Sequence, residues 1–312
     1  MSITERIDNI TKIPDDYLGT AIPIPQSVKI ELTGRCNFKC SFCARSDNLR
    51  PQSDMNRGFF DRIVPEMSRA GVKELGLFYL GESFLCPWLP DAVSYAKQWF
   101  PYVFLTTNGS LANTDKVGEL MNAGLDSLKF SFNYASSDQF TEIAGVKPEF
   151  FDKIIQNVKG AWEIRKENGY KTGLYASYIE FDGDQGQKMK EVIKQVTPYL
   201  DEVYSLPLYN QANFCTKKET ERGWKPQAGN RGRIGNLRDP IPCWAVFTEG
   251  HITYDGKLSA CCFDHANCFE MADLNKVGFV EGWNSIEFMN LRAAHLSKNL
   301  EGTACEYCVA YN

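Results

Sequence analysis

Eleven cysteines give this 312-residue chain its clearest potential for chemistry. Three of them, Cys36, Cys40 and Cys43, are spaced as CxxxCxxC. Thiolates at this spacing on one short loop can converge on a single site for a soft metal. Three protein ligands leave a coordination position open, as a catalytic metal requires, whereas a structural zinc site normally closes with four ligands. The spacing therefore predicts a metal site with one open position.

A second group of cysteines begins 200 positions after the first group ends. Clustered cysteines in an odd number are poorly explained by disulfides in a chain whose start carries charges and no apolar signal segment. The two groups therefore predict two separate metal sites. Because paired cysteines also hold structural zinc, zinc stays open as an alternative for the second group. This group comprises Cys243, Cys261, Cys262, Cys305 and Cys308.

Three cysteines stand outside both groups. We predict that Cys86 is a small buried apolar residue, as isolated cysteines usually are. Cys215 and Cys268 lie in segments that we predict to be loops. His265 is close in sequence to the second group, and we predict a solvated loop histidine there rather than a metal ligand.

The residues between the two groups alternate between strand-like and helix-like segments. Six such units predict an α/β fold with a parallel sheet and right-handed crossovers, arranged as a partial (β/α)6 TIM-like barrel. In such barrels the chemistry gathers at the carboxyl ends of the strands, and the first cysteine group directly follows the first strand. The predicted strands are 27–32, 74–79, 102–106, 127–132, 172–181 and 202–208, and the predicted helices are 57–70, 89–99, 113–123, 148–166 and 187–196.

The segments outside the barrel differ from it in composition. The first 26 residues are rich in proline and turn formers and predict an irregular lead-in. Residues 211–242 are polar and basic and predict a connecting loop. The last unit predicts a β-hairpin over 247–262, with its tight turn at Asp255-Gly256, followed by a helix over 283–298. The chain thus divides into residues 1–26, 27–210, 211–242 and 243–312.

The overall composition restricts the class of protein. Hydrophobic residues make up 43% of the chain and charged residues 23%, as in soluble globular proteins. A net charge of −5 argues against nucleic acid as a partner, because phosphate binding needs a clustered basic face. Apolar stretches are only about strand length, so we expect no membrane span and a cytoplasmic protein.

The loop that carries the first group, Thr33–Cys43, has an aromatic residue, Phe42, before its last cysteine. A CxxxCxΦC loop after the first strand of a partial barrel resembles the radical S-adenosylmethionine (SAM) superfamily. Three further stretches resemble motifs of that family. They are Tyr79–Ser83 (YLGES), like the GGE motif but with Leu80 replacing its first glycine; Leu105–Gly109 (LTTNG); and Ser131–Asn133 (SFN).

The resemblance implies a 4Fe–4S cluster held by the three cysteines of the first loop, with one iron left to chelate SAM. One electron from the reduced cluster then cleaves SAM to a 5′-deoxyadenosyl radical, which takes a hydrogen atom from an unactivated C–H bond. The cofactor carries this chemistry, while the protein orients it and excludes water. The resemblance implies SAM-binding roles for Leu80, Gly81, Glu82, Asn108, Ser131 and Asn133.

The C-terminal unit resembles the SPASM/Twitch extension of the same superfamily. The matching residues are Cys243-Trp244, Ile252–Asp264 (ITYDGKLSACCFD), Gly282–Ser285 (GWNS), Leu291-Arg292 and Cys305–Cys308 (CEYC). The resemblance implies one auxiliary 4Fe–4S cluster with four cysteine ligands, because full SPASM domains carry seven cysteines for two clusters. Adjacent strand residues face opposite sides, so one residue of the Cys261-Cys262 pair should ligate, and the family pattern favours Cys261. The implied ligands are Cys243, Cys261, Cys305 and Cys308.

Two functions follow from the resemblance. The compact length and the single auxiliary cluster favour oxidation or epimerisation of a small polar substrate, such as a sugar or aminocyclitol. In an epimerase, Cys215 or Cys268 would donate the returning hydrogen atom. A peptide- or protein-modifying enzyme of the SPASM type is the alternative. Either enzyme implies a reductant such as flavodoxin or ferredoxin.

Overall fold

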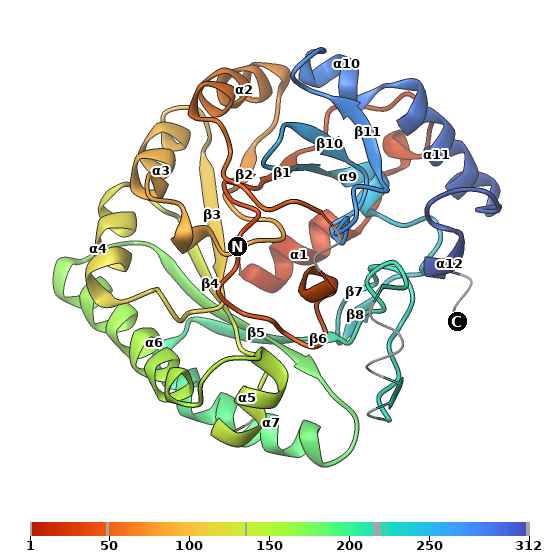
Figure 1. Cartoon of the computed structure of the whole chain (residues 1–312). Coiled ribbons are helices and arrows are strands. Elements are labelled where there is room, and N and C mark those ends of the chain that lie inside the picture. The colour runs from red at the N-terminus through yellow and green to blue at the C-terminus, as the bar shows by residue number, and fades with distance from the viewer. Residues whose placement is uncertain (1, 48–49, 135, 215–219, 222, 310–312) are drawn as a thin grey trace.

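The computed structural model describes residues 2–47, 50–134, 136–214, 220–221 and 223–309. A nine-stranded sheet curves around its centre, with most helices on its outer face (Figure 1). Six of its strands, β1 to β6, run parallel in chain order, which confirms the predicted α/β barrel-like architecture. These strands are β1 (Ser27–Ile30), β2 (Glu74–Gly76), β3 (Tyr102–Thr107), β4 (Ser127–Ser131), β5 (Gly173–Glu180) and β6 (Glu202–Pro207).

The helices between these strands confirm the predicted ones, with local signals at their ends. The Asn56 side chain caps α2 by accepting a hydrogen bond from the Phe59 N–H, and Gly71 ends the helix in the left-handed conformation. Their apolar faces pack on the sheet, so the core lies between helices and strands. These helices are α2 (Arg57–Ala70), α3 (Leu89–Lys97), α4 (Thr114–Asn122), α6 (Glu149–Asn168) and α7 (Asp184–Val196).

The C-terminal strands continue the same sheet. Strand β9 (Glu249–Ile252) pairs in parallel with β1, and β10 (Lys257–Ser259) and β11 (Glu270–Asp273) follow in antiparallel order. The predicted hairpin is confirmed, and Gly256 makes its turn with a φ of +82°. Its place beside β1 was not anticipated, because the sequence pattern of a strand does not reveal a partner so far along the chain. The two cysteine groups therefore share one continuous sheet.

The N-terminal segment corrects one prediction. Residues Ile3–Thr11 form helix α1 rather than an irregular lead-in. Ser2 and Glu5 make a capping box at its start, a signal that the proline-rich stretch after it obscured. The helix lies in the centre of the ring of strands (Figure 1). It is held there by Glu202 of β6, whose carboxylate accepts from the Ile3 N–H at 2.9 Å.

Several further elements were not predicted. Helix α5 (Ser137–Ala144) lies between β4 and α6, and the connecting segment contains a short antiparallel pair, β7 (Gly232–Arg233) and β8 (Asn236–Leu237). Among the described helices, none combines the length and apolar composition needed to cross a bilayer. Helix α11 (Ile286–Ser297) confirms the helix predicted over 283–298, whereas the short C-terminal helices α9 (Ala245–Thr248), α10 (Phe279–Trp283) and α12 (Glu306–Val309) were not predicted.

Buried Arg292 of α11 ties the C-terminal unit to the rest of the fold. Its guanidinium donates to the carbonyls of Trp283, Val246 and Thr20 at 2.8, 3.2 and 3.0 Å. Three segments far apart in sequence therefore meet on one side chain. This gives the Leu291-Arg292 match of the sequence a structural role.

Candidate active site

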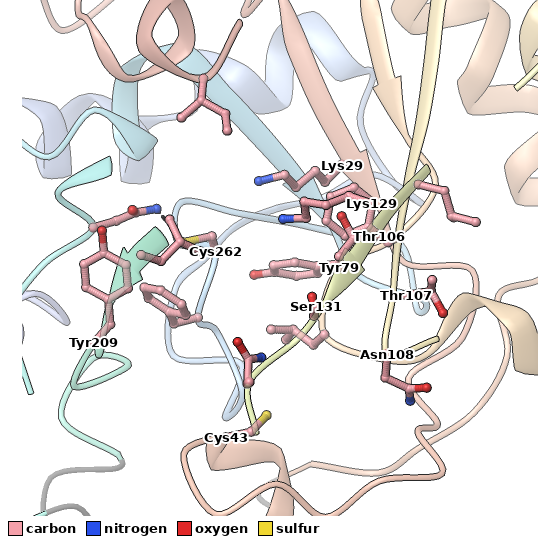
Figure 2. Close-up of a pocket in the computed structure, with 18 of the residues that line it drawn as sticks. Lys29, Cys43, Tyr79, Thr106, Thr107, Asn108, Lys129, Ser131, Tyr209 and Cys262 are labelled. Carbon is pink, nitrogen blue, oxygen red and sulfur yellow. Dashed lines mark hydrogen bonds between the residues drawn. The ribbon is translucent and has the colours of Figure 1, made fainter. Parts of the chain in front are cut away.

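One cavity of about 410 Å³ is lined by all three cysteines of the first group and by Cys262 of the second. It lies inside the curved sheet, and its walls come from strands, from α1 and from both cysteine-bearing loops (Figure 2). Its size and its mainly apolar lining with a few polar groups are typical of cofactor and small-molecule sites. The lining includes every predicted residue of the first metal site and the SAM site, namely Cys36, Cys40, Cys43, Leu80, Gly81, Glu82, Asn108, Ser131 and Asn133.

The first cysteine loop is held by helix α5. Its backbone donates from Lys39 to the Ala144 carbonyl at 2.9 Å and from Ser41 to the Ile143 carbonyl at 2.8 Å. Burial raises the pKa of Cys36 to about 11, and the nearby carboxylate of Glu82 adds to the shift. Burial and the neighbouring cysteines of the loop also raise the pKa of Cys40 well above its ordinary value. Buried thiols this close together need a cation to become thiolates, as metal ligands do.

The loop after β2 approaches the cysteine loop so closely that only glycine fits at position 81. A Cβ atom on Gly81 would lie 2.0 Å from the Thr33 carbonyl oxygen and 2.7 Å from that of Arg35. The next residue secures this approach, because the Glu82 N–H donates to the Arg35 carbonyl at 2.8 Å. The side chain of Leu80, where the sequence departs from the GGE pattern, leaves this backbone arrangement intact.

Glu82 links β2 to β3 from inside the protein. Its carboxylate accepts from the Thr107 hydroxyl at 2.8 Å and from the Asn108 N–H at 2.7 Å. Burial raises its pKa despite these bonds. Asn108 in turn donates to the Asn37 side chain at 2.9 Å, within the cysteine loop. The LGE and TNG stretches and the first cysteine loop therefore form one hydrogen-bonded unit.

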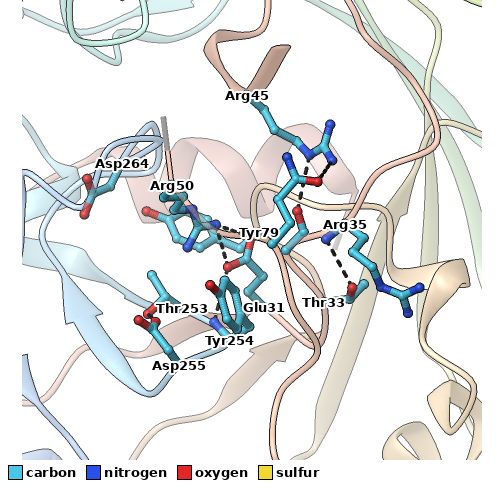
Figure 3. A network of polar contacts seen from close by, with 12 residues as sticks. Glu31, Thr33, Arg35, Arg45, Arg50, Tyr79, Thr253, Tyr254, Asp255 and Asp264 are labelled. Atoms are coloured by element: carbon cyan, nitrogen blue, oxygen red, sulfur yellow. Dashed lines mark hydrogen bonds and ion pairs between the residues drawn. The ribbon is translucent and has the colours of Figure 1, made fainter. Parts of the chain in front are cut away.

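A buried ion pair ties this unit to the C-terminal hairpin (Figure 3). Arg50 donates to both carboxylate oxygens of Glu31 at 2.6 Å, and the Tyr254 N–H donates to Glu31 at 3.2 Å. The Tyr254 ring packs against Gly34, where a Cβ would lie 2.7 Å from the ring. Tyr79, which precedes the LGE stretch, donates its hydroxyl to the Cys261 carbonyl. The two cysteine sites are thus connected by direct contacts.

The C-terminal cysteines line a second, small cavity of about 20 Å³. The four predicted ligands all line it, and so does Cys262. Hydrogen-bond donors reach both sulfurs of the pair, from the Phe263 N–H to Cys261 at 3.3 Å and from the Asn230 side chain to Cys262 at 2.9 Å. Such N–H···S bonds are among the features that set cluster potentials. Cys262 also lines the large cavity, so its thiol stands between the two sites.

Within the described part of the chain, no three His, Cys, Asp or Glu side chains are spaced to hold one metal ion. In a 4Fe–4S cluster each cysteine binds a different iron, so its ligands stand further apart than those of a single ion.

Other predicted residues have mixed outcomes. Cys86 is buried, as predicted. Cys268 is exposed and does not line the cavity, and Cys215 lies outside the described residues. The prediction of a solvated His265 is wrong, because its side chain is buried and lines the large cavity. Burial lowers the pKa of His265 to about 3, which keeps the imidazole neutral.

Sequence reasoning missed the charged groups inside the barrel. Lys29 of β1 and Lys129 of β4 line the cavity, and Lys29 pairs with buried Glu249 at 2.6 Å. Burial alone would raise the pKa of Glu249, but Lys29 and His251 outweigh it and lower the pKa to about 2. The signal was available, because a lysine inside a short, otherwise apolar parallel strand is unusual.

Comparison with known proteins decides the family. The model of the Radical SAM superfamily matches residues 30–193, more than half of the chain. The chain belongs to the radical SAM superfamily. The model of an iron–sulfur cluster-binding domain, SPASM, matches residues 243–309. The radical SAM match covers the first cysteine loop and strands β2 to β5, and the SPASM match covers all five cysteines of the second group.

Known radical SAM relatives differ in what they act on. A probable GTP 3′,8-cyclase of Saccharolobus solfataricus is 23% identical over 289 residues, covering 82% of this chain and 89% of that protein. The crystal structure of BtrN in complex with AdoMet and 2-DOIA superposes with a TM-score of 0.58 at 14% identity, covering 91% of each chain. That of Streptococcus suis SuiB bound to the precursor peptide SuiA gives 0.64 at 15% identity, over 86% of this chain and 67% of SuiB.

The cofactors of the chain follow from its two family domains. They are SAM, a SAM-binding 4Fe–4S cluster and an auxiliary iron–sulfur cluster. The residues present fit these groups. Three thiols line an open cavity beside a glycine that tolerates no Cβ, and the C-terminal thiols enclose a small cavity.

Proposed function

We propose that this radical SAM enzyme oxidises a small polar substrate of the sugar or aminocyclitol type at a carbinol carbon. The observation that carries the proposal is the shared cavity, in which the first cysteine loop and Cys262 line the same space. A substrate in that space lies between the two cysteine sites. The superposition with BtrN over 91% of both chains supports a small substrate.

The residues have the following proposed roles. Cys36, Cys40 and Cys43 hold the first cluster, and the backbone at Leu80–Gly81 receives SAM. Asn108, Ser131 and Asn133 complete the SAM site from β3 and β4. When bound, the reduced cluster and SAM together supply a 5′-deoxyadenosyl radical, which removes a hydrogen atom from an unactivated C–H bond. Glu82 holds the loops around this site rather than meeting the ligand, since its oxygens already accept bonds from Thr107 and Asn108.

The second cysteine site has a different proposed role. Cys243, Cys261, Cys305 and Cys308 hold the auxiliary cluster, which leaves no iron open to substrate. Oxidation of the carbinol to a ketone removes one hydrogen atom, one proton and one electron. Tyr79 and Cys262 bridge the distance between the cavity and the second site, which supports that site as the electron acceptor.

Anaerobic reconstitution and reduction test the proposal. We expect the enzyme to form 5′-deoxyadenosine and methionine from SAM, slowly without substrate and faster with it. One molecule of 5′-deoxyadenosine should form for each molecule of oxidised product. Failure of the fully reconstituted, reduced protein to form any 5′-deoxyadenosine would contradict the proposal. A requirement for a precursor peptide would instead assign the chain to the peptide-modifying class.

Epimerisation is a second candidate because Cys262 presents a thiol to the cavity. A thiol there can return a hydrogen atom to the opposite face of a substrate carbon, a role for which exposed Cys268 is poorly placed. Assay in deuterated water separates the two reactions. An epimerase incorporates deuterium at the inverted carbon and a Cys262→Ala variant does not, whereas a dehydrogenase yields a ketone without that label.

A further inference from the structure

Lys129 projects from β4 into the large cavity (Figure 2). Its ammonium donates to the Tyr204 hydroxyl of β6 at 3.1 Å and lies 5.6 Å from the centre of that ring. Within the described part of the chain, no carboxylate forms an ion pair with it. The Tyr204 hydroxyl accepts from Lys129, so its own proton is free to donate into the cavity.

The other basic groups of the cavity are neutralised. Lys29 forms its ion pair with Glu249 at 2.6 Å, and Arg6 pairs with Glu74 at 2.5 Å. Lys129 therefore differs from both, although it lines the same walls. A cation facing a mainly apolar cavity is costly unless an opposite charge or hydrogen bonds compensate it.

The groups around Lys129 are hydrogen-bond donors. The hydroxyl of Thr106 lines the cavity from β3, and no side chain of the described residues bonds it. Thr106 is the register partner of Lys129 on the neighbouring strand, so the two side chains lie on one face of the sheet. Together with Tyr204 they offer an ammonium and two hydroxyls, a set that suits the oxygens of an anion.

We propose that Lys129 binds a carboxylate group of the substrate. The proposal rests on the proposed function and narrows its substrate to an anionic one, such as a uronic acid. One unpaired lysine with neutral hydroxyls matches a single negative charge. A phosphate would carry up to two charges to this single cation, so a carboxylate is the better fit.

Calorimetric titration of the oxidised holoenzyme with SAM present tests this without turnover. The probes are D-glucuronate, neutral D-glucose and D-glucose 6-phosphate. We expect glucuronate to bind about 10-fold or more tightly than glucose. Lys129→Met should weaken glucuronate binding about 10–100-fold and leave glucose binding unchanged. Lys116→Met, which removes an exposed lysine of α4, is the matched control and should bind like the wild type.

Four outcomes would overturn the proposal. They are equal binding of glucuronate and glucose, no binding of glucuronate, tighter binding of the phosphate, and a loss of SAM affinity in Lys129→Met equal to its loss of glucuronate affinity. The last would assign Lys129 to SAM. Formation of 5′-deoxyadenosine is measured separately. Lys129-dependent glucuronate binding without SAM cleavage would leave the anion site standing while the proposed function fails.

Discussion

The two cysteine sites of this protein differ in how the chain builds them and in the space they leave. The first uses Cys36, Cys40 and Cys43 from a single loop and opens on a cavity of about 410 Å³. The second draws its cysteines from three separated segments and encloses about 20 Å³. In the proposed function, a local loop with three ligands leaves one iron for SAM, whereas four converging ligands close the second site. The proposed number of protein ligands would thus separate a site for bond cleavage from a site for electron transfer.

The contacts between the sites are as informative as their differences. Tyr79 reaches from the SAM-binding side to the Cys261 carbonyl, and Cys262 lines both cavities. The pairing of β1 with β9 makes both sites part of one sheet. The comparison therefore predicts two chemically separable sites in fixed relative positions.

Removing the first site should have the largest effect. A variant with Cys36, Cys40 and Cys43 all changed to Ala should form no 5′-deoxyadenosine, because the ligands of the SAM-binding cluster are gone. Its iron should fall from roughly eight to roughly four per chain. Iron analysis and chromatography of the SAM products measure both. Finding zinc in place of the remaining iron would contradict the predicted iron–sulfur cluster at the second site.

Removing one ligand of the second site should separate SAM cleavage from substrate oxidation. Cys305→Ala or Cys308→Ala should still form 5′-deoxyadenosine but lose the oxidised product, because the substrate electron has no acceptor. Product analysis and spectroscopy of the remaining cluster make the measurement. If the oxidised product persists in a variant that lacks the auxiliary cluster, the acceptor role is wrong.

A single substitution tests the role of the close approach between Gly81 and the first cysteine loop, and we expect a smaller effect from it. Gly81→Ala must move the loop, because its Cβ would lie 2.0 Å from the Thr33 oxygen. We expect roughly a 100-fold slower formation of 5′-deoxyadenosine, as misplacing reacting groups by about 1 Å typically causes. Gly118→Ala in α4 is the control, since its Cβ meets only an ordinary contact at 3.4 Å. Equal rates in the two variants would show that the approach is not needed.

The ion pair between β1 and β9 tests how the sites are held together. Lys29→Met should destabilise the protein by about 3 kcal/mol, because Glu249 stays buried without its cation. In the wild type the depressed pKa of Glu249 stabilises the fold above its ordinary value of 4.5, and the effect is lost as pH falls toward 2. In the variant this pKa should rise, because Lys29 no longer offsets burial, although His251 remains beside the carboxylate.

The deficit of Lys29→Met should therefore be largest near pH 8 and shrink as pH falls, because the buried carboxyl then takes up a proton. Anaerobic denaturant unfolding at each pH measures it. A deficit that does not change with pH would mean that Glu249 is not the group left uncompensated.

Much of the barrel could be predicted from local pattern. Helix α2 has the same bounds in prediction and structure because its cap at Asn56 and its stop at Gly71 are local signals. The residues that the family resemblance implied for the SAM site follow strands that end at one edge of the sheet, and the structure places them around one cavity. Neither inference needed long-range information.

The rest depended on contacts between distant segments. His265 was expected in solvent because its sequence neighbours are those of a loop, but the fold buries it in the cavity wall. Cys262 was set aside because one strand residue was expected to face the cluster, whereas the structure places its thiol between the sites. No local sequence pattern indicated that β9 pairs with β1.

That strand pairing also affects how the chain is made. Lys29 and Glu249 are 220 residues apart, so at a synthesis rate of about 5–20 residues per second β1 waits roughly 10–40 s for its neighbour to emerge. During this interval one edge of β1 carries unpaired backbone groups, which can template pairing with another chain. The length of sequence between the two cysteine sites therefore sets a period in each molecule's synthesis when it is most open to aggregation. Any ribosome pause before residue 249 lengthens that period.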